Sequence, residues 1–125
     1  MKTVLSTPNA PAAIGPYSQG MRAGNLVITS GQIPVDPKTG LIPEGIEAQT
    51  KQTMENVLAV LAEAGATADN IIKTTVFLKN MDDFAAMNGV YATFFSEGKY
   101  PARSAVEVAK LPKGALLEIE AVATK

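Results

Sequence analysis

Arg103 is a residue whose chemistry suits the binding of an anion. It lies at the head of an expected strand, two residues after Pro101, in the segment YPARSAVEVAKLPKG. A guanidinium is planar, stays charged at any relevant pH and offers parallel N–H donors that match a carboxylate. The spacing fits equally well a surface arginine that pairs with Glu118 or Glu120 across a sheet. Both a carboxylate clamp and a surface ion pair are therefore possible.

Two carboxylates near the end of the chain are candidates for a base. Glu118 and Glu120 alternate along the strand expected over residues 115–123, so both point to the same face of a sheet. A strand carboxylate of this kind is more often the partner of a basic side chain than a base. It can also orient a water molecule and accept part of its proton.

Two side-chain chemistries are missing. The chain has no cysteine and no histidine, which excludes disulfides, thiol nucleophiles, thiolate metal sites and imidazole bases. The 11 Lys and Arg residues against 12 Asp and Glu residues give a net charge of −1, without a basic cluster. Because nucleic-acid binding needs positive charge to neutralise phosphates, we expect no nucleic-acid partner. Because cysteine and histidine ligands are missing, we also expect no metal.

Length and composition indicate one globular domain spanning residues 1–125. Apolar residues make up 46% of the chain and charged residues 18%, and no repeat or low-complexity linker divides it. The N-terminal segment MKTVLSTPNAPAAIGPYSQG has no apolar run of signal-peptide length, and no segment is long enough to span a membrane. We expect a cytoplasmic protein that does not insert into membranes.

The pattern of apolar residues predicts strands and helices in the order of an α+β protein. A helix is expected over residues 46–64, where Met54, Val57, Leu58 and Leu61 recur at helical spacing before Gly65. A second helix, capped by Asp82 or Asp83, is expected up to Gly98. Strands are expected over residues 3–6, 17–23, 25–33, 70–79, 102–108 and 115–123.

Two helices can cover only one face of so many strands. On the last strand, Leu117, Ile119 and Ala121 are expected to face the helices, whereas Leu116, Glu118, Glu120 and Val122 point to the other side. This second face mixes apolar side chains with carboxylates, which predicts an interface between copies of the chain that carries a polar site. On the strand at 102–108, we expect Ser104, Val106 and Val108 to form the buried face and Arg103, Ala105 and Glu107 the opposite one.

Several segments in the right order resemble the RidA (YjgF) family of enamine/imine deaminases. They are NAPAAIGPYSQG, ITSGQIPVDPKTG, KTTVFLKNMDDFAAMNGVY and YPARSAVEVAKLPKGALLEIEAVA, which together span essentially the whole chain. The resemblance implies the fold of the trimeric bacterial chorismate mutases. That fold has a mixed six-stranded sheet with two helices on one face, and its homotrimer has inward-facing sheets and three clefts between subunits. It also implies hydrolysis of 2-imino acids, such as 2-iminobutanoate and 2-iminopropanoate, to 2-oxo acids and ammonia without a cofactor.

The resemblance also implies roles for individual residues. Arg103, in the ARS motif, would bind the substrate carboxylate, and Glu118, the first glutamate of EIEA, would position the attacking water. The other substrate-binding positions it implies are Tyr17, Ser30, Gly31, Asn88 and Ala105. Ala105 departs from many relatives, which have cysteine there, but its backbone rather than a thiol would meet the substrate. We expect Glu120 to be structural.

Two other functions are weighed against imine hydrolysis. Some relatives have been described as ribonucleases or translation inhibitors, but this chain has no histidine for acid–base cleavage and no excess of basic residues. A trimer that binds 2-oxo acids or amino acids without turning them over would use Arg103 equally well. Turnover of freshly generated imine separates an enzyme from such a binding protein.

Overall fold

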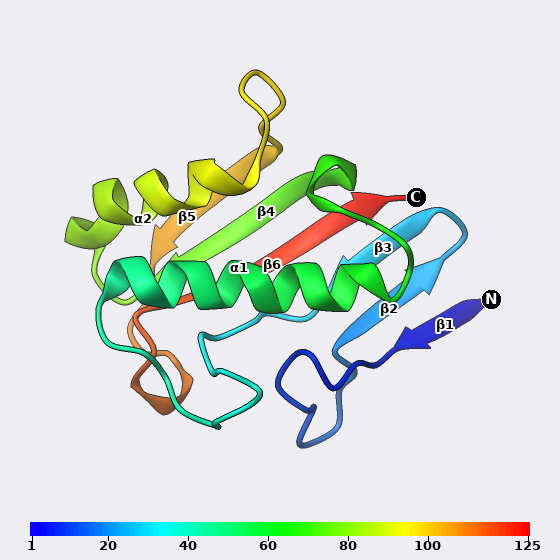
Figure 1. Cartoon of the computed structure of the whole chain (residues 1–125), viewed down its shortest axis with the longest axis horizontal. Coiled ribbons are helices and arrows are strands. Elements are labelled where there is room, and N and C mark those ends of the chain that lie inside the picture. Colours follow the sequence, from blue (N-terminus) through cyan, green and yellow to red (C-terminus); the bar gives the residue numbers. More distant parts are fainter.

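Six strands form one mixed sheet, and both helices pack against the same face of it (Figure 1). The computed structural model describes all residues 1–125. The strands are β1 (Lys2–Leu5), β2 (Gly20–Ala23), β3 (Leu26–Thr29), β4 (Ile71–Leu78), β5 (Ala102–Glu107) and β6 (Leu117–Thr124), and the helices are α1 (Ile46–Ala62) and α2 (Phe84–Tyr91). Their order across the sheet is β1-β2-β3-β6-β4-β5, with only β4 and β5 parallel. The predicted α+β architecture is confirmed. No helix has the length and apolar character needed to cross a membrane.

The core lies between α1 and the covered face of the sheet. The predicted stripe of α1 is confirmed, because Met54, Val57 and Leu61 are fully buried, whereas Leu58 is only partly so. Burial of each such side chain contributes about 1.5–3 kcal/mol, which makes this stripe the main attachment of α1 to the sheet. The helix ends just before Gly65, whose φ of 73° turns the chain toward β4.

The other face of the sheet is not covered by any part of the chain. On β6, Leu117, Ile119 and Ala121 are buried against the helices, and Glu118, Glu120 and Val122 point away from them, as predicted. Strand register places Val4, Ile28 and Val122 together on this open face. Val4, Ile28 and Val106 are 58%, 41% and 43% exposed. An open face with this apolar content is typical of a surface that packs against another molecule.

The two faces of β5 are the reverse of the prediction. Ser104 and Val106 are exposed, whereas Arg103 and Ala105 are half-buried on the side covered by α2. The register explains the reversal: Arg103 pairs with Thr74, which in turn pairs with Ala121, and both of these are buried beneath the helices. The alternation of residues along β5 predicted the wrong buried face because Ala105 and Val106 give each face an apolar residue.

Several predicted element ends also differ in the structure. A 3₁₀ turn over Met81–Asp83 precedes α2, and the side chain of Asn80 caps it by accepting a hydrogen bond from the Asp82 N–H at 2.9 Å. Asp83 occupies the N-cap position of α2, as predicted, but its side chain makes no capping hydrogen bond. The helix itself ends at Tyr91, and a second 3₁₀ turn, Ala92–Phe94, follows.

The loop between β1 and β2 is held by the buried side-chain amide of Gln19. The Gln19 side chain accepts a hydrogen bond from the Thr7 N–H at 2.7 Å and donates one to the Pro11 carbonyl at 2.8 Å. The strand predicted from Tyr17 consequently begins only at Gly20. This anchored loop places Ile14 and Tyr17, both exposed, beside the end of β3.

Candidate active site

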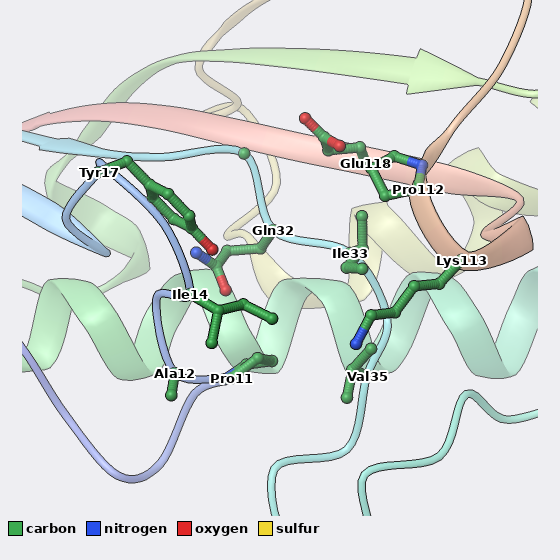
Figure 2. A pocket seen from close by; sticks show the side chains of 11 residues that line it. Pro11, Ala12, Ile14, Tyr17, Gln32, Ile33, Val35, Pro112, Lys113 and Glu118 are labelled. Carbon is green, nitrogen blue, oxygen red and sulfur yellow. The ribbon is translucent and has the colours of Figure 1, made fainter.

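The expected site residues fall into two separate groups in the chain. Tyr17, Gly31 and Glu118 line a cavity of about 340 Å³, here called the Glu118 pocket (Figure 2). Arg103 and Asn88 line a different hollow, beside α2. Glu118 pairs with Phe77 and points to the open face, whereas Arg103 pairs with Thr74 and points to the covered face. One chain therefore carries the two halves of the expected site on opposite sides of its sheet.

Gly31 lies directly against the carboxylate of Glu118. A Cβ built on Gly31 would lie 2.8 Å from the Cδ of Glu118 and would also collide with Oε2. Two backbone hydrogen bonds between Gln32 and Ile119 keep Gly31 close to Glu118. The Gln32 N–H donates to Ile119 O at 2.8 Å, and the Ile119 N–H donates to Gln32 O at 3.0 Å. A glycine is needed at position 31 for Glu118 to keep this position.

The environment of Glu118 makes its carboxylate a stronger base. Burial raises the pKa of Glu118 above its ordinary value, and the negative charge of Glu120 on the same face raises it further. A carboxylate with a raised pKa accepts a proton from a bound water more readily. Glu120 thus influences the site electrostatically, in addition to any structural role.

Several residues of the Glu118 pocket were not anticipated from the sequence. Ile14, Ile33 and Val35 form its apolar wall, and Lys113 lies at its edge (Figure 2). The side chain of Lys113 extends away from Glu118 (Figure 2). Lys113 adopts a left-handed backbone conformation with φ of 56°, which is unusual for a residue with a side chain. The Pro112–Gly114 turn was a visible signal of irregular backbone, but not of a pocket.

Ser30 lies outside the Glu118 pocket and uses its hydroxyl internally. Its Oγ donates to the Ser18 carbonyl at 2.6 Å, and its N–H donates to Gln19 O at 2.8 Å. It lines a neighbouring hollow that it shares with Tyr17. The serine hydroxyl therefore retains only acceptor capacity for a ligand.

Arg103 is held by three residues of α2, here called the Arg103 cradle: Phe84, Asn88 and Tyr91. One terminal nitrogen of Arg103 donates to Asn88 Oδ1 at 2.6 Å. The guanidinium carbon lies 4.9 Å from the ring centroid of Tyr91 and 5.3 Å from that of Phe84. Because the three cradle residues are spaced at four and three positions, they share one face of the helix.

The cradle leaves most of the guanidinium free to bind a ligand. Its one hydrogen bond within the chain goes to Asn88, out of five N–H donors that a guanidinium carries. The expected alternative, an ion pair with Glu118 or Glu120, is not formed within the chain, since both carboxylates lie on the other face. Tyr100 and Pro101 complete a hollow of about 390 Å³ next to the free donors.

Ala105 contributes backbone groups at the same edge of the sheet. The strand β5 is outermost, and the Val108 N–H donates to Leu78 O. Successive residues of a strand direct their peptide groups to opposite sides, and Ala105 lies three residues before Val108. Because the N–H of Val108 points to β4, the peptide groups of Ala105 point away from β4, toward the open edge of the sheet. Arg103 and Ala105 thus present a guanidinium and free peptide groups from one strand.

Phe84 and Tyr91, the aromatic members of the cradle, also belong to the apolar side of α2 that packs against the core. Tyr91 is indeed buried, and Phe84 is partly so. The signal that could have revealed their second role is Asn88, a polar residue set between them on the same helical face.

Comparison with known proteins agrees with the fold described above. The family model described as Endoribonuclease L-PSP matches residues 7–125. The chain belongs to this family. The 2-iminobutanoate/2-iminopropanoate deaminase of Salmonella typhimurium is 54% identical over 100% of this chain and 99% of its own length. The resemblance to the RidA (YjgF) family is thereby confirmed.

Solved structures of the family superimpose closely. The crystal structure of the Escherichia coli YjgF gene product has a TM-score of 0.94 at 53% identity and covers 98% of each chain. The structure of E. coli TdcF with bound serine has a TM-score of 0.94 at 50% identity, also over 98% of each chain. These matches extend over nearly the whole chain.

A methyl group at position 31 should abolish most activity. In Gly31→Ala the new Cβ must displace the Glu118 carboxylate, and displacement of a catalytic group by about 1 Å costs on the order of a hundredfold in rate. The variant is compared with wild type in an assay of imine hydrolysis. The control is Gly89→Ala on α2, where a Cβ meets nothing within 4 Å and activity should be unchanged. Full activity of Gly31→Ala would show that the position of Glu118 is not needed.

Removal of the Glu120 charge should shift the pH dependence. In Glu120→Gln the pKa of Glu118 falls, because the nearby negative charge that raises it is gone. If ionised Glu118 is the base, the acid limb of the kcat/KM profile moves to lower pH. Glu55→Gln, an exposed position on α1, should leave the profile in place. An unchanged acid limb in Glu120→Gln would mean that the ionisation of Glu118 does not control the reaction.

Proposed function

We propose that this protein hydrolyses reactive 2-imino acids and their enamine tautomers, such as 2-iminobutanoate and 2-iminopropanoate, to 2-oxo acids and ammonia. The observation that carries the proposal is the arrangement of Arg103, a guanidinium held by Asn88 and two aromatic rings with its other donors free. The full-length relatives named as deaminases for these two compounds support it.

The substrate carboxylate binds to the free donors of Arg103, through two parallel hydrogen bonds. The peptide groups of Ala105 bind the imine nitrogen. TdcF binds serine, an amino acid with a carboxylate and a nitrogen on adjacent atoms, as the proposed substrates have. Tyr17, which is 50% exposed at the mouth of the Glu118 pocket, covers the substrate.

Glu118 orients a water molecule and accepts its proton as the oxygen attacks the imine carbon. The new C–O bond forms while the C=N electrons move to nitrogen, which takes up a proton. The tetrahedral intermediate then collapses: its hydroxyl group gives up its proton, the nitrogen takes up one, the C–N bond breaks, ammonia leaves, and the oxygen forms the carbonyl of the 2-oxo acid. Imines already hydrolyse in water, so orientation of substrate and water is a sufficient contribution, and we expect no cofactor.

The proposal includes a homotrimer of about 39 kDa, three chains of 13.1 kDa. Because the two halves of the site lie on opposite faces of one sheet, an intact site needs a second chain. The open face, with Val4, Ile28 and Val106, supplies apolar surface for that contact. In such an assembly, the β5 edge of one subunit lies over the Glu118 pocket of its neighbour.

Two alternatives have less support. The family description names an endoribonuclease, but this chain has no histidine and a net charge of −1, which suits neither acid–base cleavage of RNA nor phosphate binding. A binding protein without turnover would need Arg103 but not an oriented base at Glu118. A cytoplasmic location stays a prediction from the sequence.

Substitution of Arg103 tests the proposal. Arg103→Lys and Arg103→Ala should each lose imine hydrolysis by about a hundredfold, corresponding to on the order of 3 kcal/mol for a bidentate charged contact. Lysine keeps the positive charge but lacks the planar group that donates two parallel hydrogen bonds. A dehydratase generates the imine, and formation of 2-oxo acid is followed, with RNA cleavage assayed in parallel.

The matched control is Arg22→Lys. Arg22 donates to the carbonyls of Gly24, Ala64 and Lys125, so it ties chain segments together away from the site, and its variant should keep its activity. Sizing of each variant separates loss of chemistry from loss of assembly. A fully active Arg103→Lys trimer would disprove the clamp, and wild-type protein that cleaves RNA but leaves imines untouched would disprove the proposed reaction.

A further inference from the structure

We propose that Thr74 is a positioning residue for the carboxylate clamp: its hydroxyl fixes the ring of Tyr91, and that ring sets the orientation of the Arg103 guanidinium. This inference rests on the proposed role of Arg103 in binding the substrate carboxylate. It extends the site to a strand that none of the expected site residues occupies.

The three residues form a closed structural unit. Thr74 on β4 pairs directly with Arg103 on β5, so both side chains rise from the same face of the sheet. The hydroxyls of Thr74 and Tyr91 are 2.7 Å apart in a buried hydrogen bond. The Tyr91 ring centroid is 4.9 Å from the guanidinium carbon of Arg103. Tyr91 therefore contacts both Thr74 and Arg103, which are neighbours on adjacent strands.

The hydrogen bond holds the Tyr91 ring at both ends. Its Cα belongs to α2, and its hydroxyl is attached to β4, so the ring cannot tilt without breaking that bond. Burial raises the pKa of Tyr91, which keeps the phenol protonated and able to take part in the bond. The fixed ring face then restricts a side chain that otherwise has several rotatable bonds.

The burial of a threonine hydroxyl on β4 has an energetic cost, which suggests that the hydroxyl of Thr74 has a role. Thr74 is fully buried on β4, which lies between β6 and β5, and valine has the same shape there and no polar group to desolvate. The hydroxyl of Thr74 is satisfied only by Tyr91. By contrast, the hydroxyl of Thr53, which is also fully buried, has no hydrogen-bond partner. Thr53 on α1 therefore provides a matched control for the substitution of a buried threonine by valine.

The experiment compares Thr74→Val, Tyr91→Phe and their double variant with Thr53→Val in imine hydrolysis. Each of the first two removes the same hydrogen bond and keeps the shape of the side chain. KM should rise about fivefold with kcat nearly unchanged, because the clamp binds the carboxylate before and during the reaction. The double variant should be no worse than either single one. Thr53→Val should leave both constants unchanged, and Thr74→Ser, which keeps the hydroxyl, should restore KM.

Binding of two ligands separates positioning from a merely structural role. Inhibition by 2-oxopropanoate should weaken about fivefold in Thr74→Val, whereas inhibition by its uncharged amide should change little, since only the carboxylate uses the clamp. Equal effects on both ligands, or an unchanged KM in Thr74→Val and Tyr91→Phe, would overturn the proposal. If Thr74→Val fails to fold, Tyr91→Phe and Thr74→Ser decide the question by the same measurements.

The outcome is distinguishable from failure of the proposed function. If Arg103→Ala loses activity while Thr74→Val keeps its KM, the clamp stands and the positioning role of Thr74 is wrong. If Arg103→Ala retains full activity, the clamp itself fails, and the proposed role of Thr74 is overturned with it.

Discussion

The hydrogen bond from Arg103 to Asn88 Oδ1 joins the edge strand β5 to helix α2 and determines what the site can bind. A half-buried guanidinium needs a hydrogen-bond partner, and here that partner is a neutral amide between two aromatic rings. A carboxylate in the same place would have neutralised the arginine. Because Asn88 orients the group without cancelling its charge, the positive charge remains available to an anionic ligand.

The same sheet imposes a second constraint on the site. Two helices cover one face, and Arg103 and the cradle belong to that covered side, while Glu118 belongs to the open one. Neither group moves to the other side without a change of strand register, which would reverse every side chain of the strand. Chemistry that needs both groups therefore requires a second chain, and the apolar residues of the open face provide the surface on which it can pack.

The parts of the fold that can be predicted are those in which the local pattern of polar and apolar residues indicates a single buried face. The stripe of α1 and the alternation of β6 predicted correctly which side chains are buried, because polar and apolar residues are sorted cleanly on them. On β5, Ala105 and Val106 give no such contrast, and the faces were assigned wrongly. The pair of Thr74 and Tyr91 could not be predicted at all, since a hydrogen bond between residues 17 positions apart depends on how α2 packs on β4.

The claim that Arg103 and Glu118 meet from different subunits is tested most directly by mixing two inactive variants, Arg103→Ala and Glu118→Gln. After unfolding and refolding together in equal amounts, about a quarter of the sites in a cyclic trimer should combine an intact arginine with an intact glutamate. We expect imine hydrolysis to return to about a quarter of the wild-type rate, whereas mixtures of Arg103→Ala with Arg103→Lys should stay inactive. A mixture of Arg103→Ala and Glu118→Gln that forms trimers yet regains no activity would contradict a site built from two chains.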